Sequence, residues 1–535
     1  MASRRQHLLF PLGVAVYLVF RLIANDADPL PWTSGLRALA VMVLLVVTLL
    51  WLLRPVVSVP EKRSLLVGTC LLLFFSYTLW LIGSQLAIRE LGVGETVARW
   101  STVIVAAAPL GPLSLIVYAI YKSRSRLTTA IAIGNIFVFV CLGFDVFGLA
   151  RPYAEGAVPR WRSAADSLAE RVLLSDMSPV QDLPDVYYVI LDGYARADVL
   201  KEVYHFDNSE FIEHLQSKGF FVPGGSRSNY VQTYLSLASA LNLSYLDELK
   251  GVMGKSQSRR PLQYLIQEKS AAVELLKRAG YRYVFLGSRY SATNFSAQAD
   301  VCHCESAGLN DLENKLMLFT PLSFVGAISA AQHRTHAQHV LRTFRDLADS
   351  SMAPGPKFVF AHVVVPHPPF VFGPRGQSVT PVGPFVLNDG NDYLGSRQGY
   401  VEGYRGQVTF VNTRIQEVVD AILSRARGAP VIILQADHGP GSELNWESIE
   451  RTNTKERSGI FAAYRVGARM RARFYETITP VNAFRIVFND LLGTRLPTLP
   501  DRTFYSPWKQ PYEFVEVTRE GVQGRAGDAG MARGR

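Results

Sequence analysis

Cysteine is scarce in this sequence, with four residues among 535. So few thiols exclude a small scaffold held together by disulfides. Cys70 and Cys141 fall within apolar stretches, where a thiol packs like a small apolar side chain. Cys302 and Cys304 flank His303, but no second cysteine pair is present to complete a four-ligand zinc site. A redox or plain surface role is therefore favoured there over metal binding.

Acidic residues are outnumbered by basic ones, 45 to 55, which gives a formal net charge of +10. Such an excess can indicate a nucleic-acid partner. Here the basic residues flank apolar segments or gather in an Arg/Gly-rich tail, and they do not alternate with aromatic residues along one element. We therefore exclude nucleic-acid binding, and we expect the tail, residues 516–535, to be disordered.

Charged residues are almost missing from five stretches in the first 150 residues. Each is close to the ~20 residues that an α-helix needs to cross a bilayer. The first is not expected to be a cleaved signal peptide, because no small-residue cleavage site follows it. The sequence thus predicts a transmembrane domain of five helices over residues 1–150. The stretches are 8–24, 36–55, 64–88, 100–121 and 127–149.

The loops between these stretches indicate their orientation. Arg4 and Arg5 precede the first stretch, and the loops before the third and the fifth are basic, whereas the alternate loops are acidic or mixed. The positive-inside rule then places the N-terminus in the cytoplasm, and five crossings place the rest of the chain outside it. A transport function is not favoured, because a helix-end Asp145 and a proline kink at 109–112 account for the only unusual residues in the spans.

The remaining chain has the pattern of an α/β domain. After a polar linker, 151–181, apolar β-branched segments alternate with helical ones up to about residue 515. Continuous apolar strands that alternate with helices predict a mostly parallel sheet covered on both faces. The predicted strands are 185–191, 281–287, 357–365, 430–435 and 459–465, and the main helical patterns are 208–218, 261–279, 311–348 and 400–426.

Metal-competent side chains follow two of these strands. Asp192 ends the first, and Asp437 and His438 end VIILQ at 431–435. The carboxyl ends of parallel strands meet at one sheet edge, where ligands of such sheets bind. Alone, Asp192-Gly193 reads as a turn, and Asp437-His438 as a helix cap with a packed imidazole. Together they predict a metal site.

A hydroxyl is available to act beside such a metal. Thr233 lies just before an apolar helical run within Ser228–Leu246, where free N–H groups and the helix dipole favour an anion. A threonine next to a divalent cation can lose its proton and attack phosphorus. The alternatives are an ordinary helix cap, or the use of Ser236, which would lie one turn into the helix.

This ordered set resembles the alkaline phosphatase/sulfatase superfamily. With apolar spans ahead of the domain, the chain is similar to membrane-anchored lipoteichoic acid synthases and phosphoethanolamine transferases. HVVVPHPPFVF (362–372), EGYRGQVTFVNTRI (402–415) and TPVNAFRIVFNDLLG (479–493) strengthen the resemblance. It implies a sulfatase-like catalytic domain over 182–515, in the bacterial inner or plasma membrane, with that domain periplasmic or extracellular.

The resemblance also implies roles for individual residues. Asp192, Asp437 and His438 would bind one divalent metal with Thr233, which would also be the nucleophile, and His367 would contact the substrate phosphate or the leaving group. His362 is a weaker candidate and reads rather as a core histidine. The donor set suits Mn²⁺ or Zn²⁺, with Mg²⁺ or Ca²⁺ as less apt alternatives.

Departures from the family patterns limit the expected nucleophile, the number of metal ions and the subfamily. The C-x-P-x-R and S-x-P-x-R signatures of sulfatases are absent, so no formylglycine nucleophile is expected. No aspartate lies four residues before His362 or His367, which favours one metal over two. Asp192 stands where lipoteichoic acid synthases use Glu, and the domain lacks the many cysteines typical of phosphoethanolamine transferases.

The predicted function is transfer of a phospho-alcohol group through a phosphothreonine. The donor would be a membrane phospholipid, and the acceptor an envelope glycan, lipid or other alcohol. Two alternatives remain open at this point. The same site could serve a hydrolase, whether phosphodiesterase, phosphatase or sulfatase, or the domain could be a non-catalytic scaffold. The donor, the acceptor and the oligomeric state are not defined by the sequence.

Overall fold

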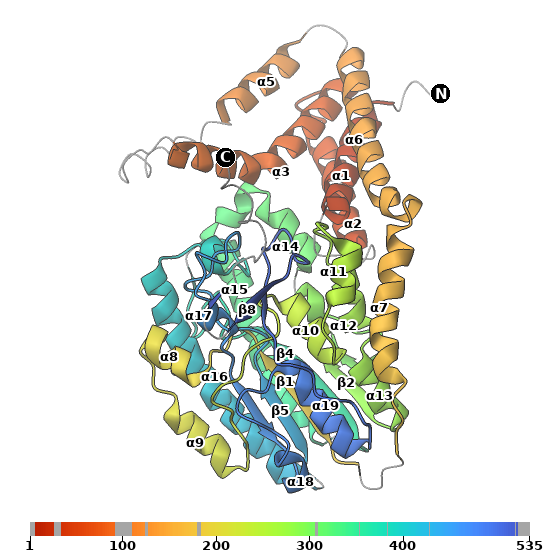
Figure 1. Ribbon diagram of the computed structural model, residues 1–535. Helices are drawn as coiled ribbons and strands as arrows, with labels where there is room; N and C mark the ends of the chain where they lie inside the picture. Colours follow the sequence, from red (N-terminus) through yellow and green to blue (C-terminus); the bar gives the residue numbers. More distant parts are fainter. Residues whose placement is uncertain are drawn as a thin grey trace, which may run out of the picture. The chain divides into compact units, whose positions relative to one another are not determined.

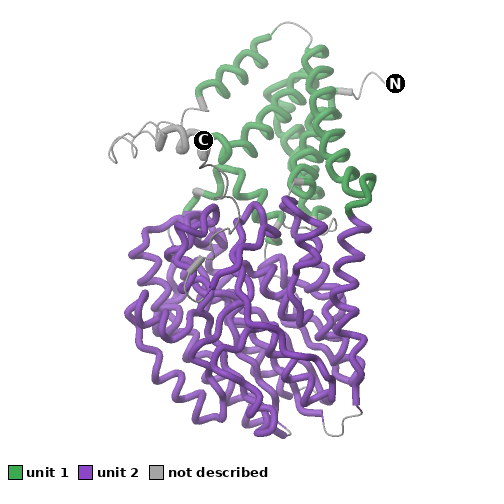
Figure 2. Tube along the Cα trace, in the orientation of Figure 1, with its two compact units in different colours: residues 1–157, 308–329 green, residues 158–307, 330–535 purple. Residues whose placement is uncertain are grey.

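The computed structural model describes residues 6–25, 34–90, 110–123, 127–178, 183–304 and 309–522, except 353, 382, 427 and 519–520. These residues form two compact units, shown in Figure 2. The first comprises residues 1–157 and 308–329, and the second comprises residues 158–307 and 330–535. The domain boundaries that we expect from the sequence remain a prediction.

The first unit is helical (Figure 1). Four of its helices contain segments long and apolar enough to cross a membrane, which indicates a membrane protein: His7–Ala24, Gly35–Leu52, Pro60–Trp80 and Thr128–Ala154. Most of the fourth predicted span, 100–121, lies outside the described residues. The helices are α1 (Gln6–Asn25), α2 (Ser34–Leu52), α3 (Pro60–Glu90), α5 (Leu110–Lys122) and α6 (Thr128–Ala154).

A segment from the middle of the chain completes this helical unit. Helix α14 (Asp311–Leu318) begins with a capping box between Asn310 and Glu313 and buries Leu312 and Leu316 in the core that α1 and α2 also form. The Glu313 carboxylate accepts hydrogen bonds from Arg37 of α2. Pro321, in the 3₁₀ turn η3 (Pro321–Phe324), separates α14 from α15 (Gly326–Ser350), so the single helix expected over 311–348 is two helices.

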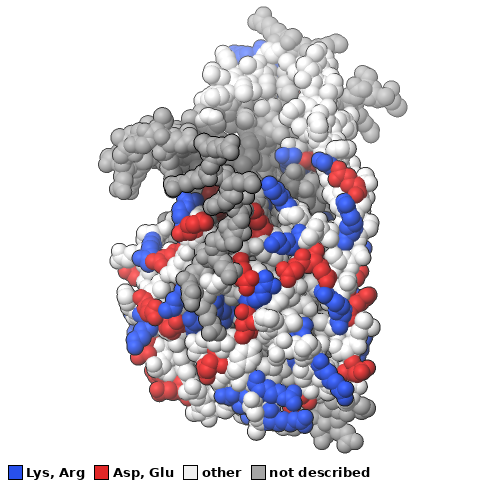
Figure 3. Space-filling model, viewed as in Figure 1, with Lys and Arg blue, Asp and Glu red and all other residues white. Residues whose placement is uncertain are grey.

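Asp145 lies on α6 within the same unit. Its carboxylate is buried and accepts a hydrogen bond of 2.6 Å from Arg21 of α1. Pairing of this kind reduces the cost of a charge among apolar helices. Figure 3 shows that the visible surface of the helical unit is mostly uncharged, whereas the second unit mixes acidic and basic side chains over its surface.

The second unit is built on a six-stranded sheet of order β3-β2-β4-β1-β5-β6. All neighbouring pairs are parallel except β5–β6, so the predicted mostly parallel sheet is confirmed. The short edge strand β3 was not anticipated. The strands are β1 (Val186–Leu191), β2 (Arg282–Leu286), β3 (Val301–His303), β4 (Lys357–Val363), β5 (Val431–Gln435) and β6 (Ala462–Arg465).

Helices cover both faces of this sheet. Tyr188 of β1 packs in one apolar core and its neighbour Tyr187 in the other, because successive side chains of a strand point to opposite faces. The first core is shared with α7 (Ala157–Leu173), α10 (Thr233–Leu241), α12 (Arg260–Gln267), α13 (Ala271–Arg278) and α19 (Pro480–Leu491). The second is shared with α8 (Ala197–Tyr204), α9 (Ser209–Ser217), α15 (Gly326–Ser350) and α16 (Arg397–Arg425).

Two segments differ from the local expectations. The stretch read as a polar linker contains α7, which buries Trp161 and Leu168. At the other end, strand β8 (Val515–Thr518) pairs with β7 (Phe504–Tyr505) and β9 (Gly521–Val522). The rest of the tail expected to be disordered lies outside the described residues. Short helices α11 (Asp247–Met253), α17 (Thr454–Ser458) and α18 (Ala468–Arg471) complete the unit, with 3₁₀ turns η2 (Ser291–Thr293) and η4 (Gly390–Asp392).

Candidate metal centre and active site

The structure brings the predicted metal ligands together. Asp192 follows β1, and Asp437 and His438 follow the neighbouring strand β5, so register alone places them at one sheet edge. Nε2 of His438 lies 3.6 Å from Oδ1 of Asp192 and 3.1 Å from Oδ2 of Asp437. One ligand atom from each of the three residues lies within 4.8 Å of the others, and all three residues are buried.

Each carboxylate presents one oxygen to this site, and its other oxygen has a polar neighbour outside the site. Oδ1 of Asp437 accepts a hydrogen bond of 3.2 Å from the Gly193 N–H, and Oδ2 of Asp192 lies 3.2 Å from Nε2 of His362. The opposite oxygens, Oδ1 of Asp192 and Oδ2 of Asp437, are buried without a hydrogen-bond partner among the described residues. Buried carboxylate oxygens are costly unless paired, so this donor set fits one divalent cation.

The imidazole of His438 is arranged as a ligand. Its Nδ1 lies 2.9 Å from the carbonyl oxygen of Gly439, to which it donates, so Nε2 carries the lone pair toward the carboxylates. Burial, with the Arg457 guanidinium nearby, lowers the pKa of His438 and favours the neutral ring. At Asp192, burial opposes ionisation, but His367 and His362 hold the pKa of the carboxyl well below its usual range.

Thr233 is the first residue of α10 and lies beside these ligands. Its Oγ1 is 3.0 Å from Nε2 of His438. Gln232, with extended backbone angles, occupies the cap position, so the hydroxyl of Thr233 is directed to the centre and does not cap the helix. Ser236 is buried one turn later and does not line the cavity at the centre. The structure therefore brings together Thr233 and not Ser236 with the metal ligands.

A cavity of about 100 Å³ opens onto this centre. It is walled by polar groups at the sheet edge and by aromatic and apolar side chains around them. Three acidic residues and one arginine are the formally charged residues of its described lining, and no lysine is among them. The lining residues are Asp192, Thr233, Tyr290, Val364, His367, Leu387, Asn388, Asp389, Asp392, His438, Trp446, Arg457 and Trp508.

His367 enters the cavity without joining the metal ligands. Its ring centroid lies 6.3 Å from that of His438. Nδ1 donates to the carbonyl oxygen of Pro368 at 2.6 Å, and Nε2 lies 3.9 Å from Oδ2 of Asp389. The backbone N–H of His367 donates to the Asp192 carbonyl at 3.0 Å, which fixes the loop after β4 to the loop after β1.

Asp389 and Arg457 form a buried ion pair that sequence reasoning missed. Nη1 of Arg457 donates to Oδ2 of Asp389 at 2.6 Å, and the Tyr400 hydroxyl donates to Oδ1 at 2.7 Å. Although burial opposes ionisation, the Arg457 guanidinium and His367 hold the pKa of Asp389 below its usual range. Asp389 lies in NDGND, which reads as a turn, and Arg457 lies in a polar stretch, so neither carries a local signal.

Gly439 and Gly441, which follow His438, are needed because other chain segments pack closely against their backbone. A Cβ on Gly439 would overlap the carbonyl oxygen of Glu456, and one on Gly441 would come within 2.5 Å of an Asp389 oxygen. The Gly439 N–H donates to the Arg457 carbonyl at 2.7 Å. The glycines thus permit close approach of the Asp389–Arg457 pair to the strand end.

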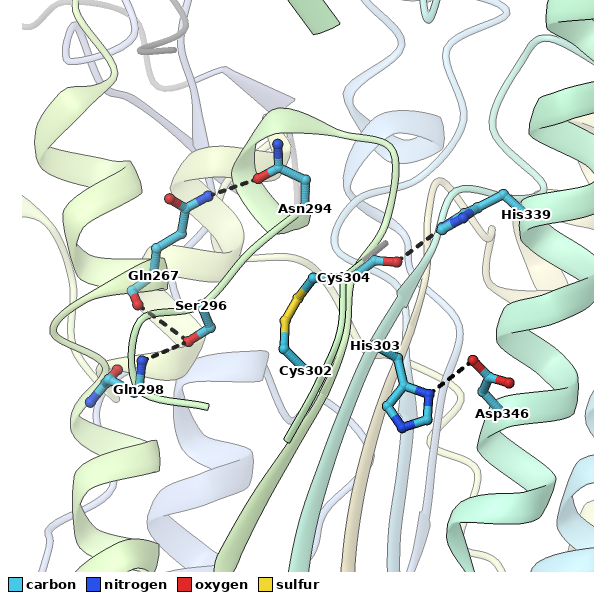
Figure 4. Close-up of a disulfide and its surroundings, with 10 residues drawn as sticks. Gln267, Asn294, Ser296, Gln298, Cys302, His303, Cys304, His339 and Asp346 are labelled. Carbon is cyan, nitrogen blue, oxygen red and sulfur yellow. Dashed lines mark hydrogen bonds and ion pairs between the residues drawn. A yellow bond between two sulfur atoms is a disulfide. The ribbon is translucent and has the colours of Figure 1, made fainter. Parts of the chain in front are cut away.

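Cys302 and Cys304 lie apart from this centre, at the end of edge strand β3, and they are joined by a disulfide (Figure 4). Bonded sulfurs are not available as thiolate ligands. His303 points away from the disulfide, toward Asp346 of α15, with its Nδ1 3.1 Å from Oδ2 of Asp346.

The model of the sulfatase family matches residues 184–467, more than half of the chain. The chain belongs to the sulfatase family. Membership agrees with the parallel sheet and with the candidate metal ligands at its carboxyl edge. This sulfatase-family protein is an enzyme acting on ester groups. A search of curated protein sequences found no match.

Solved structures similar to this sulfatase-family chain are distant. The C-terminal periplasmic domain of EcEptC from Escherichia coli is 12% identical with a TM-score of 0.41, covering 64% of this chain and 95% of that one. Lipooligosaccharide phosphoethanolamine transferase A from Neisseria meningitidis, an integral membrane protein, is 13% identical with a TM-score of 0.36, covering 92% and 99%. BT1596, a 2-O GAG sulfatase, is 13% identical with a TM-score of 0.38, covering 59% and 72%. At such scores these likenesses carry no argument about the substrate.

Proposed function

We propose that this protein is a membrane-bound, metal-dependent phosphotransferase that moves a phospho-alcohol group from a phospholipid donor to an alcohol acceptor of the cell envelope. The main support for this proposal is the position of the Thr233 hydroxyl, which lies at the start of α10 and 3.0 Å from Nε2 of His438. Asp192, Asp437, His438 and Thr233 would hold one Mn²⁺ or Zn²⁺ ion. When bound, this cation would lower the pKa of the Thr233 hydroxyl and neutralise phosphate oxygens.

The residues of the chain divide the reaction into two displacements. The reactive form of Thr233 would be the alkoxide, whose proton is lost to solvent as the cation binds and is not needed again, because the second displacement regenerates the alkoxide. In the first displacement, the Thr233 oxygen forms a bond to phosphorus and the bond from phosphorus to the donor alcohol breaks. His367, whose Nε2 faces the cavity, supplies the proton to the departing oxygen. In the second, the acceptor hydroxyl gives a proton back to His367, its oxygen bonds to phosphorus, and the Thr233 oxygen leaves. The helix N-terminus favours the anionic phosphate throughout.

The charges of the cavity favour a phosphodiester over a phosphomonoester. The one arginine in the described lining is paired with Asp389, and the two carboxylates of the centre would balance a divalent cation. Apart from His367, which carries the proton used in the first displacement, little positive charge among the described lining residues then remains for a second negative charge on the substrate. A diester carries one negative charge at neutral pH and a monoester two, so the diester needs less compensation.

The apolar helices provide the membrane context of this proposal. The N-terminus would be cytoplasmic and the catalytic unit extracytoplasmic, as the loop charges indicate. A lipid donor suits an enzyme attached to the bilayer. Hydrolysis by the same residues, with water as acceptor, is the alternative, and the sulfatase variant of it is disfavoured because the formylglycine signature is absent.

The test uses the full-length protein purified in detergent and incubated with phospholipid micelles. We expect about one Mn or Zn per chain by elemental analysis, and an adduct on Thr233 by peptide mass spectrometry. Thr233→Ala should lack the adduct, whereas Ser236→Ala, in the same helix but outside the cavity, should retain it. Metal and lipid turnover without an adduct would replace the transferase with a hydrolase. Absence of both metal and adduct would leave a non-catalytic scaffold.

A further inference from the structure

His362 belongs neither to the cavity lining nor to an apolar core. It lies on β4, in register with Ile190 of β1, two residues before Asp192. Its side chain is 0% exposed and that of Asp192 is 4% exposed. Nε2 of His362 lies 3.2 Å from Oδ2 of Asp192, the oxygen turned away from His438. His362 therefore contacts a proposed metal ligand at the oxygen other than the one next to His438.

A second buried group fixes the imidazole of His362. Oγ1 of Thr293, in the turn η2, lies 2.7 Å from Nδ1 of His362. Oγ of Ser288 lies 2.8 Å from Oγ1 of Thr293, and the Ser288 N–H donates to the Thr293 carbonyl at 2.7 Å, which closes the turn. Thr293 is fully buried. The hydrogen bond with Thr293 thus holds Nδ1 of His362, whereas Nε2 forms no hydrogen bond with the described residues and faces Oδ2 of Asp192 at 3.2 Å.

The donor and acceptor properties of these groups determine which nitrogen of a neutral His362 carries the proton. An ionised carboxylate only accepts, so the proton of a neutral His362 must lie on Nε2, facing Asp192. Nδ1 then accepts from the hydroxyl of Thr293. A hydroxyl can donate to this nitrogen and accept from Ser288 at the same time. The opposite tautomer would turn a lone pair toward the Asp192 carboxylate.

We propose that His362 and Thr293 are positioning residues that orient Asp192 and thereby set the affinity of the centre for its metal. Oδ2 of Asp192 lies 3.2 Å from Nε2 of His362, and the other oxygen, Oδ1, lies near His438. Partners that orient a metal ligand typically contribute 10–100-fold to metal affinity when they are lost. The inference rests on the proposed metal site but not on the proposed transfer reaction.

The experiment measures Zn²⁺ affinity of the full-length protein in detergent by competition with a chromophoric chelator. His362→Met should lower the affinity about 10–100-fold. Thr293→Val, which keeps the shape but removes the hydroxyl, should lower it by a smaller factor. His362→Gln retains an N–H donor for Asp192, and Thr293→Ser retains the hydroxyl, so both should stay close to wild type.

A matched control separates positioning from loss of stability. His336 is also buried in the sheet unit, and its ring nitrogens have no hydrogen-bond partner among the described residues. His336→Met should leave Zn²⁺ affinity unchanged, whatever it does to the melting temperature. The proposal is overturned if His362→Met binds Zn²⁺ like wild type, if His336→Met weakens binding equally, or if wild type binds no Zn²⁺. If the Zn²⁺ affinities of the variants are as expected but wild type forms no adduct on Thr233, only the proposed transfer reaction is overturned.

Discussion

The Arg457–Asp389 pair permits a quantitative prediction of stability. Arg457 is 1% exposed, and its guanidinium donates to Asp389 at 2.6 Å, to the Gly439 carbonyl at 2.9 Å and to the Val231 carbonyl at 3.0 Å. Arg457→Met keeps much of the apolar stem and removes every donor. The Asp389 carboxylate would then be buried beside the centre, keeping the Tyr400 hydroxyl and the more distant His367 but losing its guanidinium partner.

The expected loss is about 3–5 kcal/mol, the usual cost of breaking a buried ion pair by removing one partner. A surface pair costs much less, typically below about 1 kcal/mol. Asp389→Asn should cost a similar amount, because it leaves the guanidinium unpaired. The double variant should cost less than the two single losses added together, since neither charge is then left alone.

The assay is denaturant unfolding of the full-length protein in detergent, followed by tryptophan fluorescence. Trp446 stacks near the Arg457 guanidinium, 5.0 Å from ring centroid to Cζ, and reports on this part of the sheet unit. In wild type the pKa of Asp389 is below its usual value, so its contribution to stability is present above about pH 4 and is lost as the pH falls. In Arg457→Met burial dominates and raises that pKa, so the deficit should shrink from pH 7 to pH 4.

The matched control is Arg469→Met. Arg469 is 80% exposed and pairs with Asp490 at 3.1 Å, so the same substitution should change stability by less than about 1 kcal/mol. If Arg457→Met were no more destabilising than Arg469→Met, or if its deficit grew as the pH fell, the assignment of Arg457 as the cation that stabilises a buried Asp389 would be wrong.

Three further predictions concern the surroundings of the centre. Gly439→Ala should weaken Zn²⁺ binding at least 10-fold in the chelator assay, because the added Cβ displaces the backbone next to His438; unchanged binding would contradict the close approach. Burial raises the pKa of Glu456 to about 7, so this carboxyl should make the unfolding free energy fall by about 3 kcal/mol as the pH rises from 4.5 to 7. Glu456→Gln should flatten that pH profile, and an unaltered slope would refute the assignment. Chelation with EDTA should lower the melting temperature reversibly, with Zn²⁺ or Mn²⁺ restoring it, whereas Asp192→Asn should show little response to either.

Much of the site could be predicted because parallel strands share an edge. Asp192 and Asp437-His438 follow two apolar strands, and the parallel pairing of β1 with β5 suffices to bring them together. Thr233 was recognisable from its place before an apolar helical run, since a helix start is a local property. The apolar helices were recognisable from length and composition, which depend on the bilayer thickness and not on tertiary contacts.

Other features depend on contacts that no local pattern contains. Asp389 and Arg457 are 68 residues apart, and only the packing of their loops makes them a pair. Residues 308–329 join the helical unit because Leu312 and Leu316 complete its core, although the sequence pattern places them within the predicted domain over 182–515. The direction of β6 and the sheet order are likewise set by connections through space.

The sequence by itself thus determined the apolar helices, the class of sheet and the candidate ligands, because hydropathy periodicity and strand ends are properties of neighbouring residues. Only the tertiary structure decided what each buried polar group faces. It placed Nε2 of His362 next to Oδ2 of Asp192, and the guanidinium of Arg457 next to the carboxylate of Asp389. The physical reason is that the cost of burying a charge depends on its partners, and these partners come from distant segments of the chain.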